Sequence, residues 1–124
     1  MYTIDYLPGS HTLEIAIIGF LSEEDVADFA RDLAAKLASI RTSTPPASLY
    51  NYTAAAVQPL KVIEAFQAIA RRVKPGRRIA LYADSAMARQ QARRIAGECP
   101  TMLTFSTRDD AVAWLQASPA AAVA

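Results

Sequence analysis

The feature that most restricts the fold of this chain is a short apolar run followed directly by a helix-starting signal near the carboxyl terminus. Met102–Phe105 is mostly apolar and lies between polar residues, which is typical of a buried strand. Thr107 then offers an N-cap hydroxyl with Asp110 in the capping-box position, and the short helix that follows ends on Trp114 and Leu115. A strand that passes into a capped helix indicates a layered α/β domain.

Four more strands are expected upstream of this segment. Tyr2–Tyr6 alternates apolar and polar residues, and Thr12–Ile18 follows after the turn residues Pro8–Ser10, so the two predict an antiparallel hairpin. Ser48–Tyr52 reads as a short aromatic strand. Ile79–Ala83 is nearly all apolar, which is typical of a strand covered on both faces.

Three helices are expected between these strands. The first begins at Ser22, a candidate N-cap, and the second has Pro59 in the place of a first helical residue. Either Asp84 or Ser85 caps the third helix, whose thin apolar face begins at Met87. The three helices are predicted to cover residues 22–40, 59–73 and 84–97.

The resulting order is ββαβαβαβα, with the four strands after the first joined by helical crossovers. Such crossovers allow parallel pairing, so we expect a single-domain α/β fold with a five-stranded mixed sheet. Residues 1–117 of the 124 are predicted to form this domain. The tail, 118–124, is Ala-rich without periodicity and is predicted to be disordered.

Composition points to a soluble, cytoplasmic protein. Hydrophobic residues make up 52% of the chain, but no apolar run approaches the ~20 residues of a membrane span, and no signal peptide is visible at the start. Cys99 is the single cysteine, which leaves no internal disulfide and suits a reducing compartment. We expect its thiol to fill space near a helix end.

Charge is unevenly distributed although the net charge is only +1. Residues 1–60 carry three basic and seven acidic side chains, whereas residues 61–108 carry ten basic and three acidic ones. This asymmetry predicts either an anionic partner, a second copy of the chain, or two solvated faces of opposite sign.

Five blocks of sequence, spread over nearly the whole chain, form a recognisable pattern. They are Ile18–Leu21, the acidic helix start Ser22–Asp25, Leu49–Tyr52, Arg78–Tyr82, and Phe105 together with Asp110–Leu115. With the element order, these blocks resemble the STAS superfamily, specifically its SpoIIAA-like branch. The resemblance implies a SpoIIAA-like fold and a binding or regulatory role.

The resemblance also implies two kinds of site. Some anti-sigma-factor antagonists of this superfamily are switched by phosphorylation of a serine at the helix start after the third strand. Here that stretch, 53–58, contains no serine, and Thr53 is its one hydroxyl side chain. The fold is further similar to the lipid-binding CRAL-TRIO type, which implies an apolar ligand between the sheet and the helices.

No catalytic signature emerges from the residues themselves. His11 is the only histidine and lies at the hairpin turn, and no Cys or second His completes a zinc shell, so neither a metal nor a cofactor is expected. Asp84 and Ser85 follow a buried strand, where open α/β sheets place ligands, although helix capping is the favoured explanation for both. A hydrolase that uses them is the remaining enzymatic hypothesis.

An apolar pocket is the first candidate binding site. Tyr50 and Tyr52 alternate along one strand and should face the same side, and Phe20 follows the second strand at a comparable level. Core packing accounts for these aromatic residues equally well. The candidate ligand-binding residues are Phe20, Tyr50, Tyr52, Thr53, Phe66, Asp84 and Ser85.

A basic run is the second candidate site. It surrounds a Pro-Gly turn and lacks interleaved aromatic residues, so we expect an anionic membrane surface rather than nucleic acid. A solvated helix end is the alternative, because cations suit the helix dipole there. The run comprises Arg71, Arg72, Lys74, Arg77 and Arg78.

Two functions follow from these patterns. The main hypothesis is a non-enzymatic binding module for a small amphipathic or lipid-like ligand, peripheral to an anionic membrane. The alternative is a regulatory protein-interaction module of the anti-sigma-factor-antagonist type, without the usual phosphorylatable serine and with homodimerisation as one outcome.

Overall fold

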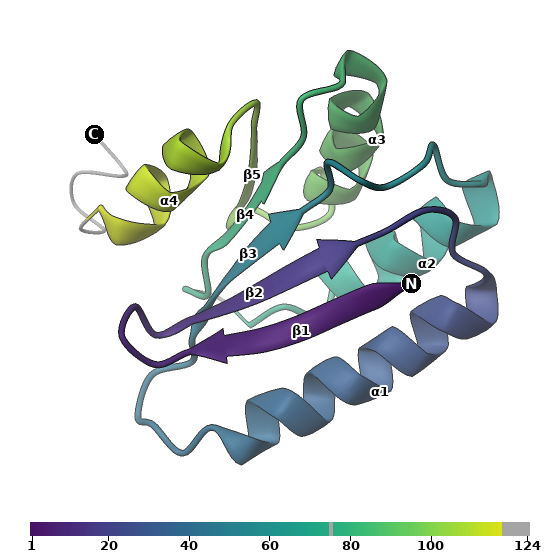
Figure 1. Cartoon of the computed structure of the whole chain (residues 1–124). Coiled ribbons are helices and arrows are strands. Elements are labelled where there is room, and N and C mark those ends of the chain that lie inside the picture. The colour runs from purple at the N-terminus through teal and green to yellow at the C-terminus, as the bar shows by residue number, and fades with distance from the viewer. Residues whose placement is uncertain (75, 118–124) are drawn as a thin grey trace.

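The computed structural model describes residues 1–74 and 76–117, which form one α/β domain. Figure 1 shows a sheet with helices on both of its faces. The prediction for 118–124 lies outside the described residues. The strands are β1 (Tyr2–Leu7), β2 (Thr12–Ile17), β3 (Ala47–Asn51), β4 (Ile79–Tyr82) and β5 (Met102–Phe105). The helices are α1 (Glu23–Ser39), α2 (Leu60–Ala70), α3 (Ala86–Ala96) and α4 (Arg108–Gln116).

The sheet has the strand order β1-β2-β3-β4-β5, so neighbours in the chain are neighbours in space. β1 pairs with β2 in antiparallel register, with Ile4 opposite Ile15, whereas β2 to β5 are parallel. The five-stranded mixed sheet and the ββαβαβαβα order predicted from sequence are therefore confirmed. All carboxyl ends of the parallel strands consequently lie at one edge of the sheet, and all amino ends at the other.

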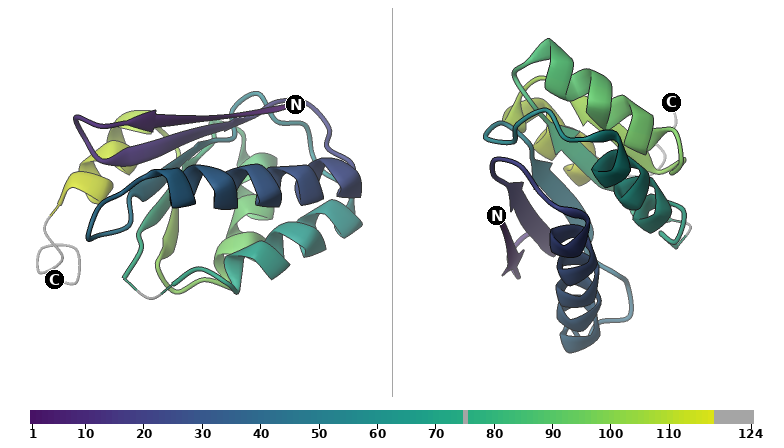
Figure 2. Two further views of the ribbon diagram at one scale, coloured as in Figure 1. Left: turned by 90° about the horizontal axis from the view of Figure 1, so that it is seen from below. Right: turned by 90° about the vertical axis from the view of Figure 1, so that its right-hand side faces the viewer.

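Three helices cover one face of the sheet and the fourth covers the other (Figure 2). α1, α2 and α3 share a core with the side chains of β2, such as Leu13, Ile15 and Ile17, which are fully buried. On the opposite face, Ala111 of α4 packs with Leu49 and other residues of β3 and β4. β4 is buried along its whole length because it is the strand covered on both faces.

Phe29 of α1 is the centre of an aromatic cluster that joins four elements. Its ring meets Tyr2, Tyr50 and Phe66 edge to face, with centroid distances of 5.2, 6.2 and 5.8 Å. Such geometry is the favoured one for aromatic pairs, and each contributes about 0.5–1.5 kcal/mol beyond the area it buries. The cluster fixes α1 and α2 against β1 and β3.

The helix boundaries follow capping chemistry with two departures from the sequence analysis. Ser22 and Asp25 form the complete capping box of α1, and Ser85, not Asp84, caps α3. Pro59 is the N-cap of α2 rather than its first residue, and it supplies no side-chain hydrogen bond. At α4 the Asp110 N–H donates to Thr107 Oγ1 at 3.2 Å, which is one half of the predicted box.

Candidate functional site

Two loops meet at the carboxyl edge of the sheet, one after β2 and one after β3. The Gly19 N–H donates to Ala54 O at 2.9 Å, and the Ala56 N–H donates to Gly19 O at 3.1 Å. Gly19 adopts φ +67°, a left-handed conformation that glycine enters without a steric penalty. The two loops therefore form a short parallel bridge beyond the regular strands.

Buried Gln58 ties these loops to each other and to α3. Its Oε1 accepts from the Leu21 N–H at 2.8 Å, while its Nε2 donates to Gly19 O at 2.7 Å and to Ala56 O at 2.8 Å. Its main chain makes a reciprocal pair with the Gln91 side chain of α3, at 2.9 Å in each direction. Because these donors and acceptors are satisfied internally, the loops are held rigidly.

Large apolar side chains lie exposed on this hydrogen-bonded frame. Phe20 sits between the bonded residues Gly19 and Leu21 and is 71% exposed. Leu60 and Met87, each 63% exposed, occupy the first turns of α2 and α3. Together these side chains form what we call the apolar edge, which consists of Met1, Phe20, Val57, Leu60 and Met87.

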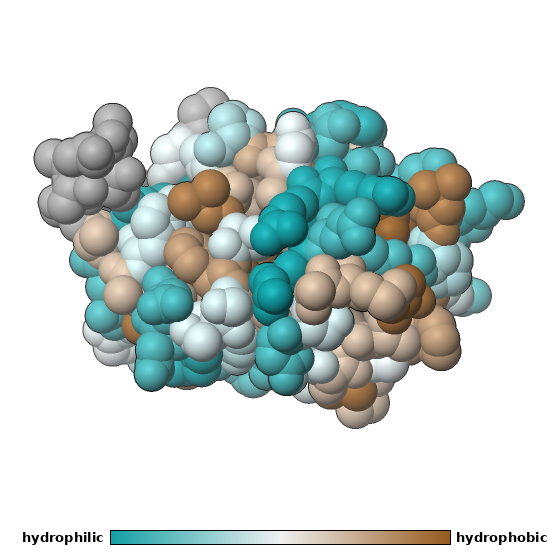
Figure 3. Space-filling model, turned by 90° about the horizontal axis from the view of Figure 1, so that it is seen from above, coloured by the Kyte–Doolittle hydropathy of each residue, from teal (hydrophilic) through white to brown (hydrophobic). Residues whose placement is uncertain are grey.

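The members of the apolar edge are neighbours because of the contacts beneath them. The Met1 carbonyl accepts from the Ile18 N–H at 2.8 Å, which places Met1 beside the β2 loop. Met87 precedes Gln91 by four residues, so it lies on the face of α3 that bonds to Gln58. Figure 3 shows apolar side chains at the right of the molecule, the side to which β2 and β3 run in Figure 1, with hydrophilic side chains between them and a further apolar group on the left.

Acidic residues border the apolar edge. Glu23 and Glu24 are exposed in the first turn of α1, and Asp84 is exposed after β4. Asp25 is held by the Ser22 N–H and hydroxyl, and these hydrogen bonds lower the pKa of its carboxyl. A partner at this edge would meet an apolar centre with acidic residues at the start of α1. Positive charge lies there as well, from exposed Lys61, from Arg89, which donates to the Asp84 carbonyl, and from the Met1 ammonium.

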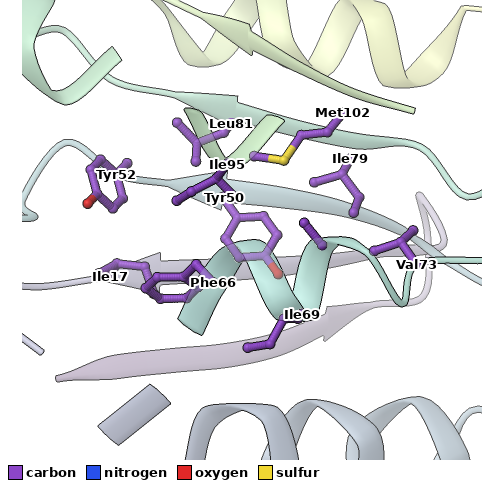
Figure 4. Close-up of a pocket in the computed structure, with 11 residues that line it drawn as sticks. Ile17, Tyr50, Tyr52, Phe66, Ile69, Val73, Ile79, Leu81, Ile95 and Met102 are labelled. Atoms are coloured by element: carbon purple, nitrogen blue, oxygen red, sulfur yellow. The ribbon is translucent and has the colours of Figure 1, made fainter. Parts of the chain in front are cut away.

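The predicted pocket beneath α2 exists, but it is small. Tyr50, Tyr52 and Phe66 line it together with side chains from α3 and β5, as Figure 4 shows. Its cavity volume is about 40 Å³, whereas sites for small molecules of drug size occupy about 300–1,000 Å³. The prediction that Phe20 lines this pocket is wrong, because the chain turns outward at Gly19 and exposes the Phe20 ring.

Tyr52 connects this cavity to the glutamine frame. Its hydroxyl donates to Gln91 Oε1 at 3.4 Å, a long hydrogen bond, and the ring is buried. Burial raises the pKa of Tyr52 to about 12. The phenol is therefore a neutral donor at physiological pH and serves the packing of the site.

The remaining candidate ligand residues lie at the carboxyl edge but do not converge. Ser85 Oγ accepts from the Ala88 N–H at 3.1 Å as the cap of α3, and Asp84 beside it is exposed. Thr53 is exposed, and its N–H donates to Asn51 Oδ1 at 3.0 Å. The N-cap of α2 is Pro59, so this helix start carries no hydroxyl group at the capping position.

The structure divides the predicted basic surface among three environments. Arg71 pairs with Glu98 at 3.0 Å, and Arg72 and Lys74 are exposed at the end of α2. The expectation that Arg77 presents its charge at the surface is wrong, because this side chain is only 8% exposed. The same expectation is wrong for Arg78, whose guanidinium contacts Trp114 of α4.

Arg78 points to the opposite face of the sheet. Its guanidinium carbon lies 4.7 Å from the centre of the Trp114 ring, and Nη1 donates to Ala117 O at 2.6 Å. It leaves the Arg77 side because side chains alternate along an extended chain. The cation thus fastens α4 to the sheet and is not available for a membrane contact.

Within residues 1–74 and 76–117, no three His, Cys, Asp or Glu side chains lie close enough together to hold a metal ion. Over the same residues, no helix has the length and apolar character needed to cross a bilayer.

Comparison with known proteins adds solved structures but no sequence relatives. No protein-family model matches the sequence, and no curated protein matches it. One similar structure is an uncharacterised DUF3478-family protein from Shewanella loihica, which is described as having a SpoIIAA-like fold. It superimposes with a TM-score of 0.68 at 20% sequence identity, over 93% of this chain and 92% of that one. The chain has a SpoIIAA-like fold.

Two other structures agree with that assignment. An anti-sigma factor antagonist from Mycobacterium paratuberculosis gives a TM-score of 0.69 at 14% identity, over 94% of this chain and 96% of that one. The anti-sigma factor antagonist SpoIIAA in its unphosphorylated form gives a TM-score of 0.64 at 14% identity, over 90% of this chain and 93% of that one. The fold that the sequence resemblance implied is confirmed, and at these identities the likeness concerns the fold alone.

Sequence reasoning missed several residues that define the carboxyl edge. Gln58 and Gln91 are polar residues in or beside helices, and only their mutual bonding marks them as a frame. Met87 was assigned to the apolar face of α3 but is exposed. The exposure of Leu60 could have been predicted, because this residue lies outside the apolar stripe of α2 that begins at Val62.

Proposed function

We propose that this protein is a non-enzymatic regulatory module that binds another protein through the apolar edge. The observation that supports the proposal is the exposure of large apolar side chains on loops and helix starts that the hydrogen bonds of Gln58 and Gln91 tie together. Contiguous exposed apolar surface on a folded protein marks interaction sites. Rigid loops lower the cost of association, because little conformational freedom is lost on binding.

Two neighbours with the same fold are anti-sigma factor antagonists, which supports a regulatory role rather than catalysis. The acidic start of α1 favours a partner that places basic residues against that helix end, since complementary charge guides association. Pro59 at the start of α2 argues against control by phosphorylation at that position. We therefore propose regulation through partner availability or abundance.

Site-specific photo-crosslinking tests the proposal. A photoreactive phenylalanine replaces Leu60 of the apolar edge, and a matched one replaces Leu103 of β5, which is also exposed at 47%. The partner captured at position 60 in the native cell is identified, purified and titrated against the unmodified protein. We expect Phe20→Ser and Met87→Ser to weaken that binding by at least about tenfold each, as central apolar contacts do.

The control is Leu103→Ser, which should leave the affinity of the purified partner unchanged. Equal capture at positions 60 and 103, or equal affinity of Phe20→Ser and the unchanged protein, contradicts the proposal. Analytical ultracentrifugation examines the homodimer alternative. A dimer that Phe20→Ser converts to a monomer makes a second copy the occupant of the apolar edge.

A further inference from the structure

A second site lies at the amino edge of the sheet, away from the apolar edge. A groove with a volume of about 630 Å³ opens between the carboxyl-terminal half of α1, the segment 42–46 and the end of α2. Leu33, Leu37 and Ile69 give it apolar walls, and Tyr50 contributes to its floor. The volume is within the range of about 300–1,000 Å³ that small-molecule sites occupy.

Arg77 lines this groove as a buried cation without a carboxylate partner among the described residues. Its Nε donates to Pro46 O at 3.2 Å, and its Nη2 donates to Ser48 Oγ. Both acceptors are neutral, and burial lowers the pKa of the guanidinium. Buried charges are normally paired, so an anion in the groove would supply the missing counter-charge.

Tyr50 offers a second polar contact next to Arg77. Figure 4 shows its ring extending from β3 with the hydroxyl directed toward α2. Burial raises the pKa of Tyr50 to about 12, so the hydroxyl is protonated at neutral pH and can donate a hydrogen bond. In the part of the chain that the structure describes, no hydrogen bond occupies this hydroxyl.

The remaining charges of the groove have the same sign as Arg77. Arg72 and Lys74 line it and are exposed at its rim, and no Asp or Glu is among the described lining residues. Arg71 differs, since it pairs with Glu98 and does not line the groove. The groove therefore combines a cationic end with an apolar wall, which runs about 12 Å along α1 from Ala30 to Ala38.

We infer that this groove binds a free single-chain amphiphile with a carboxylate head, such as a medium-chain fatty acid. The carboxylate lies near Arg77, Arg72 and Lys74, and the tail lies along α1 between Leu33 and Ile69. The cationic end of the groove, with buried Arg77, favours an anionic head group. The length of the apolar wall sets the length of the ligand's tail. This site is separate from the apolar edge and does not depend on the function proposed there.

Titration with decanoate, followed by amide chemical shifts, tests the inference. Decanol has the same tail without the charge and serves as the matched ligand. Below the micelle concentration of decanoate, we expect saturable shifts at groove residues and a dissociation constant at least about tenfold lower than for decanol. No shifts with decanoate, or equal affinity for decanol, overturns the inference.

Matched variants separate the groove from the general surface. Ala34→Trp fills the groove from an exposed position of α1, and Ala35→Trp places the same ring on the neighbouring exposed position outside it. We expect Ala34→Trp to abolish decanoate binding and Ala35→Trp to leave it within about twofold. Equal binding by the two variants contradicts the inference.

Charge reversals test the cationic end. Arg72→Glu with Lys74→Glu should weaken decanoate binding about tenfold or more, whereas reversal of exposed Arg93 and Arg94 on α3 should not. Phe20→Ser should have no effect, which keeps this result distinct from a failure at the apolar edge. Co-sedimentation with phosphatidylglycerol vesicles in the absence of decanoate binding would also overturn the inference, because the headgroup of a membrane would then be the ligand.

Discussion

The carboxyl and amino edges of the parallel strands differ in which groups they bury and which they expose. At the carboxyl edge, polar groups are buried and satisfied by Gln58 and Gln91, while the apolar edge faces water. At the amino edge, the apolar walls face inward across a groove, and the charge of Arg77 is buried without a counter-ion among residues 1–74 and 76–117. One edge presents a surface, and the other presents a recess.

One fold can therefore provide two kinds of candidate binding site at opposite ends of the same strands. Short loops at the carboxyl edge are tied to one another by main-chain hydrogen bonds. At the amino edge, the connection after α1 contains Pro45 and Pro46, which cannot continue the helix, and the segment 42–46 forms one wall of the groove. The following predictions test this contrast.

Among changes at the two edges, the largest effect is expected from Gln58→Leu at the carboxyl edge. The change leaves the Leu21 N–H and the Ala56 carbonyl without their buried partner, so the free energy of unfolding should fall by about 2–4 kcal/mol. Urea denaturation measures the change. Gln90→Leu, at an exposed position of α3, should alter stability by less than about 0.5 kcal/mol. Similar losses of stability in the two variants would contradict the assignment that Gln58 holds the loops of the carboxyl edge together.

Arg77→Met at the amino edge should lower the free energy of unfolding by about 2 kcal/mol. Pro46 O and Ser48 Oγ lose their donor, although removal of an unpaired buried charge offsets part of that loss. Arg71→Met is the control, because its exposed pair with Glu98 is worth at most about 1 kcal/mol. Chemical denaturation at low and high salt compares them, and an equal loss in both variants would contradict the assignment of Arg77 as buried support.

Alkaline pH should reveal the buried tyrosine near each edge. Burial raises the pKa of Tyr50 and of Tyr52 from 10.0 to about 12. The folded state therefore keeps protons that the unfolded state loses. Stability is fully present below pH 10 and declines as the pH rises toward 12, by an amount on the order of 2 kcal/mol for Tyr50.

Absorbance of tyrosinate in the native and urea-unfolded protein follows this titration. Tyr50→Phe should remove part of the decline in stability above pH 10 and should leave stability at pH 7 within about 0.5 kcal/mol. Decanoate should not perturb the Tyr52 signal if the two tyrosines belong to separate sites. Ionisation of both tyrosines at their ordinary pKa would contradict their burial.

The smallest change in stability is expected from Phe20→Ala. The ring is exposed, so its removal should change the free energy of unfolding by no more than about 0.5 kcal/mol. Phe29→Ala removes an aromatic ring at the centre of the core and should cost about 3–5 kcal/mol. Thermal denaturation compares the pair, and a large loss in Phe20→Ala would show that this side chain serves folding rather than binding.

Most of the fold could be predicted because its signals are local. Apolar periodicity and N-caps such as Ser22 and Thr107 located every strand and helix to within a few residues. The sites were less predictable because they depend on which side chains meet. Phe20 and Arg77 illustrate the failure, since the aromatic residue turned outward and the charged residue turned inward.

Periods, caps and turns within short segments specify the order of elements and allow parallel pairing after the hairpin, and the resemblance of five sequence blocks implied the SpoIIAA-like fold. Packing between distant elements places Gln58 against Gln91 and Arg77 beneath a groove. Those contacts join residues more than 25 positions apart, and no local pattern encodes them. Burial and exposure of single side chains result from packing between distant elements, and the two candidate sites arise from that packing.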